Sequence, residues 1–422
     1  MTSEIKQRIE RIRRGEVPER YVKTALGLAP ANWKRYTFGD IYTERKEPGD
    51  ENLPLLMVSI HSGVSDGEVD AAELPKQVKR IEDKSQYKKA VSGDLVFNMM
   101  RAWQGAIGTV RTTGMVSPAY IVAEPNDKAY PLFMDYYSRT PQMINQIDRQ
   151  SYGVTDFRKR LYWDSFAPIS CTLPPIEEQQ KIAAILTTQD RVIELKEKRL
   201  AEKQRQKKYL MQQLLTGKKR LPGFSGEWKN IKLCEVLSER KEKNVEQNLR
   251  ICSVAVQKGV IDQIEHLGRS YAASDTSNYS VAHYGDIIYT KSPTGDFLYG
   301  IVKQNLLQET VAVSPLYGVF TPMTFGLGYF LHTYFQSAIC AQNYLLPIVQ
   351  KGAKNTINIT NDTFISSKLY LPLDVEEQKA IADTFIAADR EIELLRQDIR
   401  QEKQKKKALM QLLLTGIVRV KT

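Results

Sequence analysis

The chain of 422 residues has only four cysteines and four histidines, and it lacks any long run of apolar residues. Its cysteines, Cys171, Cys234, Cys252 and Cys340, stand far apart, with no Cys-x-x-Cys pair and no nearby histidine. This pattern excludes a disulfide framework and offers no metal-ligand spacing, so we expect buried, inert thiols. No stretch approaches the ~20 apolar residues that a membrane-spanning helix needs.

Recognisable catalytic motifs are also missing. No Gly-x-x-x-x-Gly-Lys-Ser/Thr loop for nucleotide phosphates occurs, and the histidines are too scattered to indicate a catalytic triad. Three Glu-x-Lys fragments fit part of a nuclease motif, but so short a pattern occurs by chance. The segments 117–120 and 314–317 resemble the loop that holds a target amino group in DNA methyltransferases, yet each lacks its second proline and a Gly-rich cofactor loop. The sequence therefore gives no support to any of these catalytic chemistries.

Charge and composition fit a globular protein of several domains. The chain has 60 lysines and arginines against 49 acidic residues, a net charge of +11, and 42% of its residues are hydrophobic. The excess of positive charge points to nucleic acid as a partner, although a solvated basic surface explains it equally well. Residues 1–14 are basic without the apolar core of a secretory signal, so we expect the protein in the cytoplasm.

One long segment occurs twice, at a constant offset of 199 residues. Residues 177–217 return as residues 376–416, and both copies run from Glu-Glu-Gln to Leu-Met-Gln-x-Leu-Leu-Thr-Gly. Each copy follows a Leu-Pro pair and closes with glycine. Because proline favours helix starts and glycine favours helix ends, each copy predicts one helix of about 39 residues.

The segments in front of the two helices also correspond, which makes the chain a pseudo-twofold tandem repeat. Two landmarks recur: Glu44-Arg45-Lys46 as Glu239-Arg240-Lys241, and Gly93-Asp94 as Gly285-Asp286. Short apolar runs bounded by Gly, Pro and Asp predict strands. They lie at 55–60, 95–98, 119–123, 251–256, 287–290 and 316–320, and helices are expected at 131–147 and 327–346. The fold class is therefore mixed α/β (α+β), with two globular domains.

Apolar residues recur every seven positions in both long segments, which is typical of helices that pair as a coiled coil. The expected pairing residues are Ile182, Leu186, Ile193, Leu200, Leu210 and Leu214 in the first segment and Ile381, Phe385, Ile392, Ile399, Leu409 and Leu413 in the second. Lysines and a glutamine interrupt this seam, as polar residues do where they fix register. Both helices end basic and residues 376–402 are acidic, so attraction favours an antiparallel pair. The alternative is a single amphipathic helix lying on its own domain.

The repeated Leu-Pro…Glu-Glu-Gln…Leu-Met-Gln-x-Leu-Leu-Thr-Gly pattern closely resembles that of the specificity subunits of type I restriction-modification systems, over essentially the whole chain. The segment Asn98–Gly108 also resembles a motif frequent in their target-recognition domains, and the second half departs from it. The resemblance implies an N-terminal arm (1–32), target-recognition domain 1 (33–172), a central conserved helix (173–222), target-recognition domain 2 (223–370) and a C-terminal conserved helix (371–422).

The resemblance also implies a function in host defence, as a non-catalytic reader of double-stranded DNA. Each recognition domain would read one half of a gapped, asymmetric target, and the antiparallel helices would set the spacing and dock methyltransferase (modification) subunits. Restriction (endonuclease/translocase) subunits would complete the complex, and S-adenosylmethionine, ATP and Mg²⁺ would belong to those partners. The alternative function is a non-catalytic coiled-coil adaptor for protein interactions.

Basic side chains between the landmarks are the candidates for DNA contact, since Arg and Lys read guanine edges, Asn and Gln read adenine, and cations also hold phosphates. In the first half they are Arg45, Lys46, Lys76, Lys79, Arg80, Lys84, Lys88, Arg101, Arg158 and Lys159, with Trp103 and Gln104. In the second half they are Arg240, Lys241, Lys243, Lys291, Lys351 and Lys354. Arg101 suits a guanine contact; the alternative is that it holds a phosphate while Trp103 packs in the core. A solvated surface role stays open for each residue.

Overall fold

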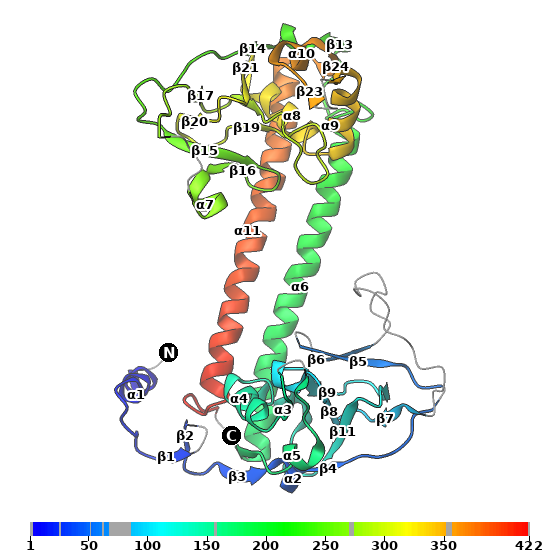
Figure 1. Ribbon diagram of the computed structural model, residues 1–422, viewed down its shortest axis with the longest axis vertical. Coiled ribbons are helices and arrows are strands. Elements are labelled where there is room, and N and C mark those ends of the chain that lie inside the picture. The colour runs from blue at the N-terminus through cyan, green and yellow to red at the C-terminus, as the bar shows by residue number, and fades with distance from the viewer. Residues whose placement is uncertain are drawn as a thin grey trace. The chain divides into compact units, whose positions relative to one another are not determined.

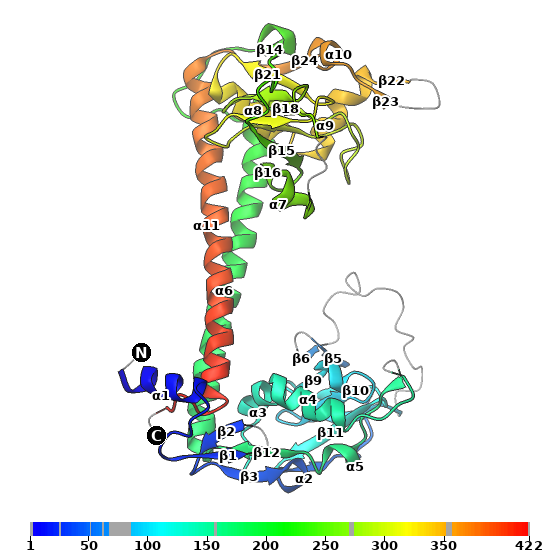
Figure 2. The same cartoon turned by 60° about the vertical axis from the view of Figure 1, so that its left-hand side comes forward.

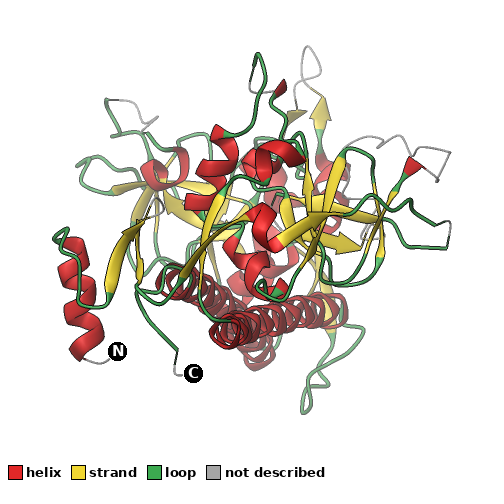
Figure 3. Cartoon of the chain, turned by 90° about the horizontal axis from the view of Figure 1, so that it is seen from below, coloured by secondary structure: helices red, strands yellow, loops and turns green. Residues whose placement is uncertain are grey.

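The computed structural model describes residues 3–24, 27–50, 52–60, 63–66, 86–155, 158–269, 274–351 and 357–420 (Figure 1). The chain forms two compact units. Unit 1 consists of Met1–Leu195 together with Ile399–Thr422, and unit 2 consists of Lys196–Asp398. Both units combine helices and strands. Figure 3 shows the helices of the chain in red and its strands in yellow.

Unit 1 contains a four-stranded antiparallel sheet in the order β4-β11-β8-β9. Its strands are β4 (Tyr42–Glu44), β8 (Leu95–Asn98), β9 (Ile107–Thr109) and β11 (Tyr120–Pro125). Antiparallel two-stranded sheets accompany it: β1 (Tyr21–Thr24) with β2 (Gly27–Pro30), β3 (Lys34–Thr37) with β12 (Ser170–Leu173), β5 (Leu56–Ser59) with β6 (Gly63–Asp66), and β7 (Lys88–Ala90) with β10 (Gly114–Val116). The shorter helices are α1 (Ser3–Arg13), α2 (Phe38–Ile41), α3 (Pro131–Tyr137), α4 (Pro141–Arg149) and α5 (Trp163–Phe166).

Unit 2 contains a matching sheet in the order β14-β21-β18-β19 and a second sheet in the order β16-β15-β20-β17. The first has β14 (Leu237–Glu239), β18 (Ile287–Tyr289), β19 (Val302–Gln304) and β21 (Gly318–Pro322); the second has β15 (Arg250–Ala255), β16 (Gly259–Asp262), β17 (Ser280–Ala282) and β20 (Val311–Val313). Unit 2 also has two two-stranded sheets: β13 (Trp228–Lys232) with β24 (Lys368–Pro372), and β22 (Gln350–Lys351) with β23 (Ile357–Asn358). Its shorter helices are α7 (Gln263–Leu267), α8 (Phe325–Tyr334), α9 (Ala338–Leu345) and α10 (Asn361–Ser366).

The mixed fold and the tandem repeat predicted from the sequence are confirmed, since equivalent strands build the sheets β4-β11-β8-β9 and β14-β21-β18-β19. The predicted helices at 131–147 and 327–346 were wrong as single elements, because each divides into two. Pro141 begins α4, and the residue before a proline avoids helical geometry. Ser337 ends the other run because its side chain accepts a hydrogen bond from the Cys340 N–H and caps α9.

The helices α6 (Ile176–Leu214) and α11 (Val375–Leu413) each have the expected 39 residues. They lie side by side in two views (Figures 1 and 2). In unit 2, the ion pairs Lys196–Asp398, Lys203–Glu391 and Lys207–Asp389 join positions that rise along α6 and fall along α11. The predicted antiparallel coiled coil is therefore confirmed, and the alternative of a lone helix on each domain was wrong.

The ends of the two helices complete the cores of the units. Ile182 and Leu186 of α6 and Leu413 of α11 are buried in the unit 1 core with Phe97 and Phe133. In unit 2, Leu214 of α6 and Ile381 and Phe385 of α11 join the aromatic core in the same way. Between these ends Ile193, Ile392 and Ile399 are also buried, whereas Leu200 is only partly buried. Each domain therefore packs on both helices.

Polar residues in the seam have partners across it. The Gln189 side-chain amide donates to the Glu402 carboxylate over 2.7 Å in unit 1, and Lys196 pairs with Asp398 at 2.8 Å in unit 2. Such pairs favour one register because a shifted helix would leave the same groups without partners. None of the described helices is long and apolar enough to cross a membrane.

Candidate nucleic-acid interface

The loop at residues 98–106 links β8 to β9 and holds the segment that differs most between the two halves. The Asn98 side-chain oxygen accepts a hydrogen bond from the Met100 N–H over 2.9 Å, and the Gln104 N–H donates to the Arg101 carbonyl over 3.0 Å. Gly105 closes the turn with a φ of 104°, which glycine adopts without strain. This geometry leaves Arg101 and Gln104 exposed.

Two backbone arms, residues 151–155 and 158–160, adjoin this loop, and we refer to them together as hairpin 151–160. The backbones of Tyr152 and Arg160 form two hydrogen bonds, of 3.0 and 2.9 Å, and the Leu161 N–H donates to the Met99 carbonyl over 2.8 Å. Gly153 permits the close approach of the two arms, since a Cβ there would lie 2.5 Å from the Arg158 backbone. The backbone thus ties the hairpin to the loop.

Trp103 and Lys159 join the loop and the hairpin through their side chains. The Trp103 indole N–H donates to the Met100 carbonyl over 3.0 Å, and the Lys159 ammonium lies 5.1 Å from the centre of the indole ring. Lys159 also pairs with Asp148 of α4 at 2.9 Å. Trp103 is partly buried against the unit 1 core, which favours its interpretation as a packing residue.

The exposed side chains of the loop and hairpin form what we call the basic face of unit 1. Its members are Arg101, Gln104, Tyr152, Arg158, Arg160 and Tyr162. Arg101 has no side-chain hydrogen bond or ion pair to the described part of the chain. Three guanidinium groups, one amide and two phenol rings supply donors for base edges and phosphates together with flat surfaces for stacking.

Sequence reasoning missed the two tyrosines of this face. Tyr152 is 63% exposed and Tyr162 is 51% exposed, which is unusual for rings that have a packed core nearby. The signal was present, because both tyrosines flank the Arg158-Lys159-Arg160 run in the sequence. Aromatic residues interleaved with cations are typical of nucleic-acid surfaces.

The equivalent loop of unit 2 is built differently. Lys291 has a φ of 62°, and Gly300 packs so tightly that a Cβ there would lie 2.8 Å from the Lys291 nitrogen. Burial lowers the pKa of Lys291, and Thr294 and Phe297 bond to each other across the loop. The second loop therefore offers one partly buried cation where unit 1 offers an exposed arginine.

Arg45 and Arg240, which we predicted as DNA contacts, form internal ion pairs. Arg45 pairs with Asp94 at 2.8 Å, and its side chain is only 11% exposed. Arg240 pairs with Asp286 at 2.6 Å. Hydrogen bonds to these aspartates raise the pKa of each arginine. The two recurring landmarks of the sequence are therefore the two partners of one repeated salt bridge, and both guanidinium groups are engaged.

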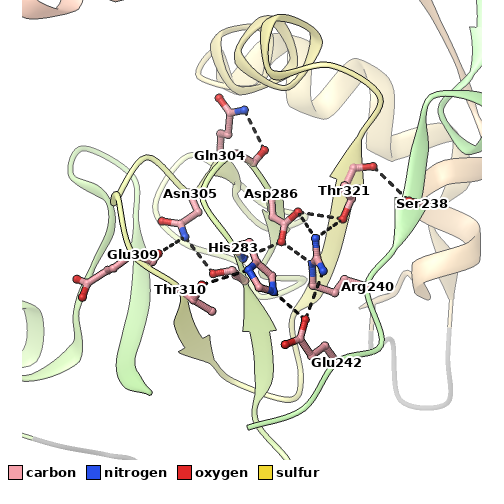
Figure 4. A network of polar contacts seen from close by, with 12 residues as sticks. Ser238, Arg240, Glu242, His283, Asp286, Gln304, Asn305, Glu309, Thr310 and Thr321 are labelled. Atoms are coloured by element: carbon pink, nitrogen blue, oxygen red, sulfur yellow. Dashed lines mark hydrogen bonds and ion pairs between the residues drawn. The ribbon is translucent and has the colours of Figure 1, made fainter. Parts of the chain in front are cut away.

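Figure 4 shows how the unit 2 copy of this pair extends into a polar network. Thr321 accepts from Arg240 over 2.8 Å and donates to Asp286 over 3.0 Å. Glu242 lies 2.7 Å from the His283 ring nitrogen, and this hydrogen bond lowers the pKa of the Glu242 carboxyl. The network joins β14, β18 and β21, so it stabilises the sheet from its polar side.

The remaining predicted residues do not gather into one site. Lys46 and Lys241 are exposed, Lys243 donates to Ser280 over 3.1 Å, and Lys88 donates to the Tyr120 carbonyl over 2.8 Å. Burial lowers the pKa of Lys88. Five predicted residues lie outside the described residues: Lys76, Lys79, Arg80, Lys84 and Lys354. The backbone of Lys351 is described, but its side chain is not. Within the described ranges there is no cluster of three His, Cys, Asp or Glu side chains that could hold a metal ion.

Comparison with known proteins relates both halves of the chain to one family. Residues 72–204 and 226–403 match the model of the type I restriction modification DNA specificity domain, so the match covers well over half of the chain. The specificity subunit of the type I restriction enzyme MjaVIII of Methanocaldococcus jannaschii is 24% identical, over 80% of this chain and 83% of that protein. The putative type I restriction enzyme MjaX specificity subunit of the same organism is 23% identical, over 96% of this chain and 98% of that protein.

A solved structure shows the same fold. The S subunit of a type I restriction-modification system from M. genitalium superposes with a TM-score of 0.53 at 11% identity, over 93% of this chain and 97% of that chain. The family model thus matches twice, once in each half of a tandem repeat whose two long helices run antiparallel. The chain therefore belongs to the family of type I restriction-modification DNA specificity subunits, a non-catalytic class of the type I system.

Proposed function

We propose that the chain binds double-stranded DNA sequence-specifically and that each recognition domain reads one half of a gapped, asymmetric target. The basic face of unit 1 carries this proposal, since backbone bonds tie loop 98–106, with its exposed Arg101 and Gln104, to hairpin 151–160, with its exposed Arg158 and Arg160. A backbone that is held in place before binding loses little freedom on binding, which favours discrimination between bases. The different loop of unit 2 supports the view that the second half-site has another sequence.

The division of labour along the chain is part of the proposal. Its segments are an arm (1–32), two recognition domains (33–172 and 223–370) and two helical segments (173–222 and 371–422). The paired helices set the distance between half-sites and dock methyltransferase subunits, and restriction subunits join that assembly. S-adenosylmethionine, ATP and Mg²⁺ serve those partners, and the assembly meets its DNA in the cytoplasm.

Selection from random duplexes tests this function. The purified chain, alone and with its methyltransferase partner, is incubated with a pool of random DNA, and the bound fraction is sequenced. We expect two short sequence elements separated by a gap of constant length. An adaptor for protein interactions would enrich no sequence, and that result would overturn the proposal.

The Arg101→Ala variant then identifies what the basic face reads. Loss of a guanidinium–guanine pair costs ~1–3 kcal/mol, so we expect affinity to fall about 5- to 150-fold and preference to relax at one position of one half-site. The matched control is Arg13→Ala, which removes an exposed arginine of α1 and should leave the preference unchanged. A uniform loss over all sequences would assign Arg101 to a phosphate.

A further inference from the structure

Three side chains from three elements meet in unit 1. The Tyr136 hydroxyl of α3 donates to Asp190 of α6 over 2.7 Å, and the Lys406 ammonium of α11 lies 2.5 Å from the other oxygen of Asp190. Lys406 also lies 5.5 Å from the centre of the Tyr136 ring. Burial raises the pKa of Tyr136 to about 12, so the phenol keeps the proton that it donates. The cluster therefore connects the globular part of unit 1 to both long helices.

Unit 2 contains the same cluster with the two helices exchanged. The Tyr329 hydroxyl of α8 donates to Asp389 of α11 over 3.0 Å, and Lys207 of α6 pairs with Asp389 at 2.5 Å. Gln336 accepts a further hydrogen bond from Lys207 over 2.9 Å. The aspartate and lysine positions of the two clusters differ by the 199-residue offset of the repeat. The pseudo-twofold relation thus extends to side-chain chemistry.

A second anchor holds each domain nearer the helix start. In unit 1, Glu178 accepts from the Trp33 indole over 3.3 Å and from Arg419, which follows α11, over 2.5 Å. In unit 2, Glu377 accepts from the Trp228 indole over 3.0 Å and pairs with Arg220. Both glutamates are buried.

The spacing of the two anchors is the same in both units. Glu178 precedes Asp190, and Glu377 precedes Asp389, by 12 residues, which is about 18 Å along a helix. The apolar core contacts of each domain with the helices are not directional, whereas hydrogen bonds and ion pairs at two points separated along a helix oppose rotation of the domain. The tyrosine clusters are the second points.

We propose that Tyr136–Asp190–Lys406 and Tyr329–Asp389–Lys207 are positioning clusters that fix the rotation of each recognition domain on the helices and thereby restrict the gap length that the protein accepts. The inference rests on the proposed function, because only a gapped target has a gap to restrict. Adding one base pair to the gap moves a half-site by ~3.4 Å and turns it by about 35° around the duplex. A domain that cannot rotate cannot follow this change.

Removal of the two hydroxyls tests the clusters with little change in volume. The variants are Tyr136→Phe, Tyr329→Phe and the double variant, each assembled with the methyltransferase partner. Matched controls are Tyr137→Phe, whose hydroxyl accepts from the Thr172 N–H, and Tyr344→Phe, whose hydroxyl donates to the Phe364 carbonyl. Both control bonds stay within the globular part of a unit. Binding is measured on the selected target and on duplexes with one or two base pairs added to or removed from the gap.

We expect wild type and controls to discriminate against altered gaps, and the double variant to lose at least about tenfold of that discrimination while both half-site sequences stay the same. A second pair of changes, Lys207→Gln with Lys406→Gln, should act in the same direction. The inference would be overturned if the double tyrosine variant and the double lysine variant both fold and both discriminate between gap lengths as the wild type does. If the wild-type protein selects no gapped target, the proposed function itself is wrong. The wild-type experiment alone shows this, so the two failures can be told apart.

Discussion

At the scale of single residues, the buried salt bridge of unit 1 assigns Arg45 a structural role. Asp94→Ala would leave the Arg45 guanidinium buried without its main partner, so we expect a loss of about 3–5 kcal/mol in the free energy of unfolding of unit 1. Urea unfolding followed by tryptophan fluorescence measures this loss. Lys46→Ala is the control, because the neighbouring lysine is 79% exposed and should change stability by less than ~0.5 kcal/mol. Equal effects of the two substitutions would contradict the assignment.

Lys303 is a buried cation that destabilises the fold. It is 4% exposed, and burial, together with repulsion from Lys207, lowers its pKa to about 8. Below pH 8 the ammonium is charged in both folded and unfolded chains and the cost of burying it is complete; as pH rises from 8 toward ~10.5, the folded chain loses its proton first and stability increases. We expect Lys303→Met to raise the free energy of unfolding by ~1–3 kcal/mol at pH 7 and by less at pH 10. Denaturant titrations at the two pH values check this, with exposed Lys229→Met as the control.

At the scale of elements, the 151–160 hairpin depends on one glycine. Gly153→Ala would bring a methyl group within 2.5 Å of the Arg158 backbone, which forces the two arms apart. We expect the basic face to be disturbed and DNA affinity to fall about tenfold, with only a small change in the melting temperature, because the hairpin lies at the surface. Gel shifts on the selected target measure the affinity. Gly226→Ala, at a glycine with open space around it, should bind as wild type does.

The elements also show where sequence reasoning succeeded and where it could not. The 39-residue helices were predictable because heptad spacing and terminal punctuation can be read within each segment, and their antiparallel pairing followed from the charge pattern of the two repeated segments. The breaks in the predicted helices at Pro141 and Ser337 had local signals, a proline and a capping serine. The continuous apolar pattern nevertheless led to the prediction of one helix in each place. The role of Arg45 could not be predicted, since its partner Asp94 lies 49 residues further along and only the folded sheet brings the two together. The exposure of Tyr152 likewise depends on the hairpin that carries it.

At the scale of the whole molecule, the helices are expected to act as a ruler. Insertion of four residues into both α6 and α11, between Leu195 and Lys196 and between Asp398 and Ile399, would add about 6 Å of helix. That length corresponds to one or two base pairs of DNA, so we expect the selected gap to grow by this amount while both half-sites stay unchanged. Sequencing of the selected duplexes reads the gap directly. Insertion into one helix alone should break the seam pairs and abolish binding; an unchanged gap in the double insertion would show that spacing is set elsewhere.

Unit 1 takes its core from both ends of the chain, whereas unit 2 is one continuous stretch, Lys196–Asp398. A ribosome adds ~5–20 residues per second, so the first recognition domain waits roughly 10–40 s after Leu195 has been made before Leu413 and Arg419 emerge. During this time Ile182 and Leu186 pack against N-terminal core residues such as Phe97 and Phe133, and only the cover from Leu413 and Leu414 is missing. The first domain therefore completes its core only after the second has been made, and we expect the nascent chain to expose this edge of the first domain until Leu413 and Leu414 emerge.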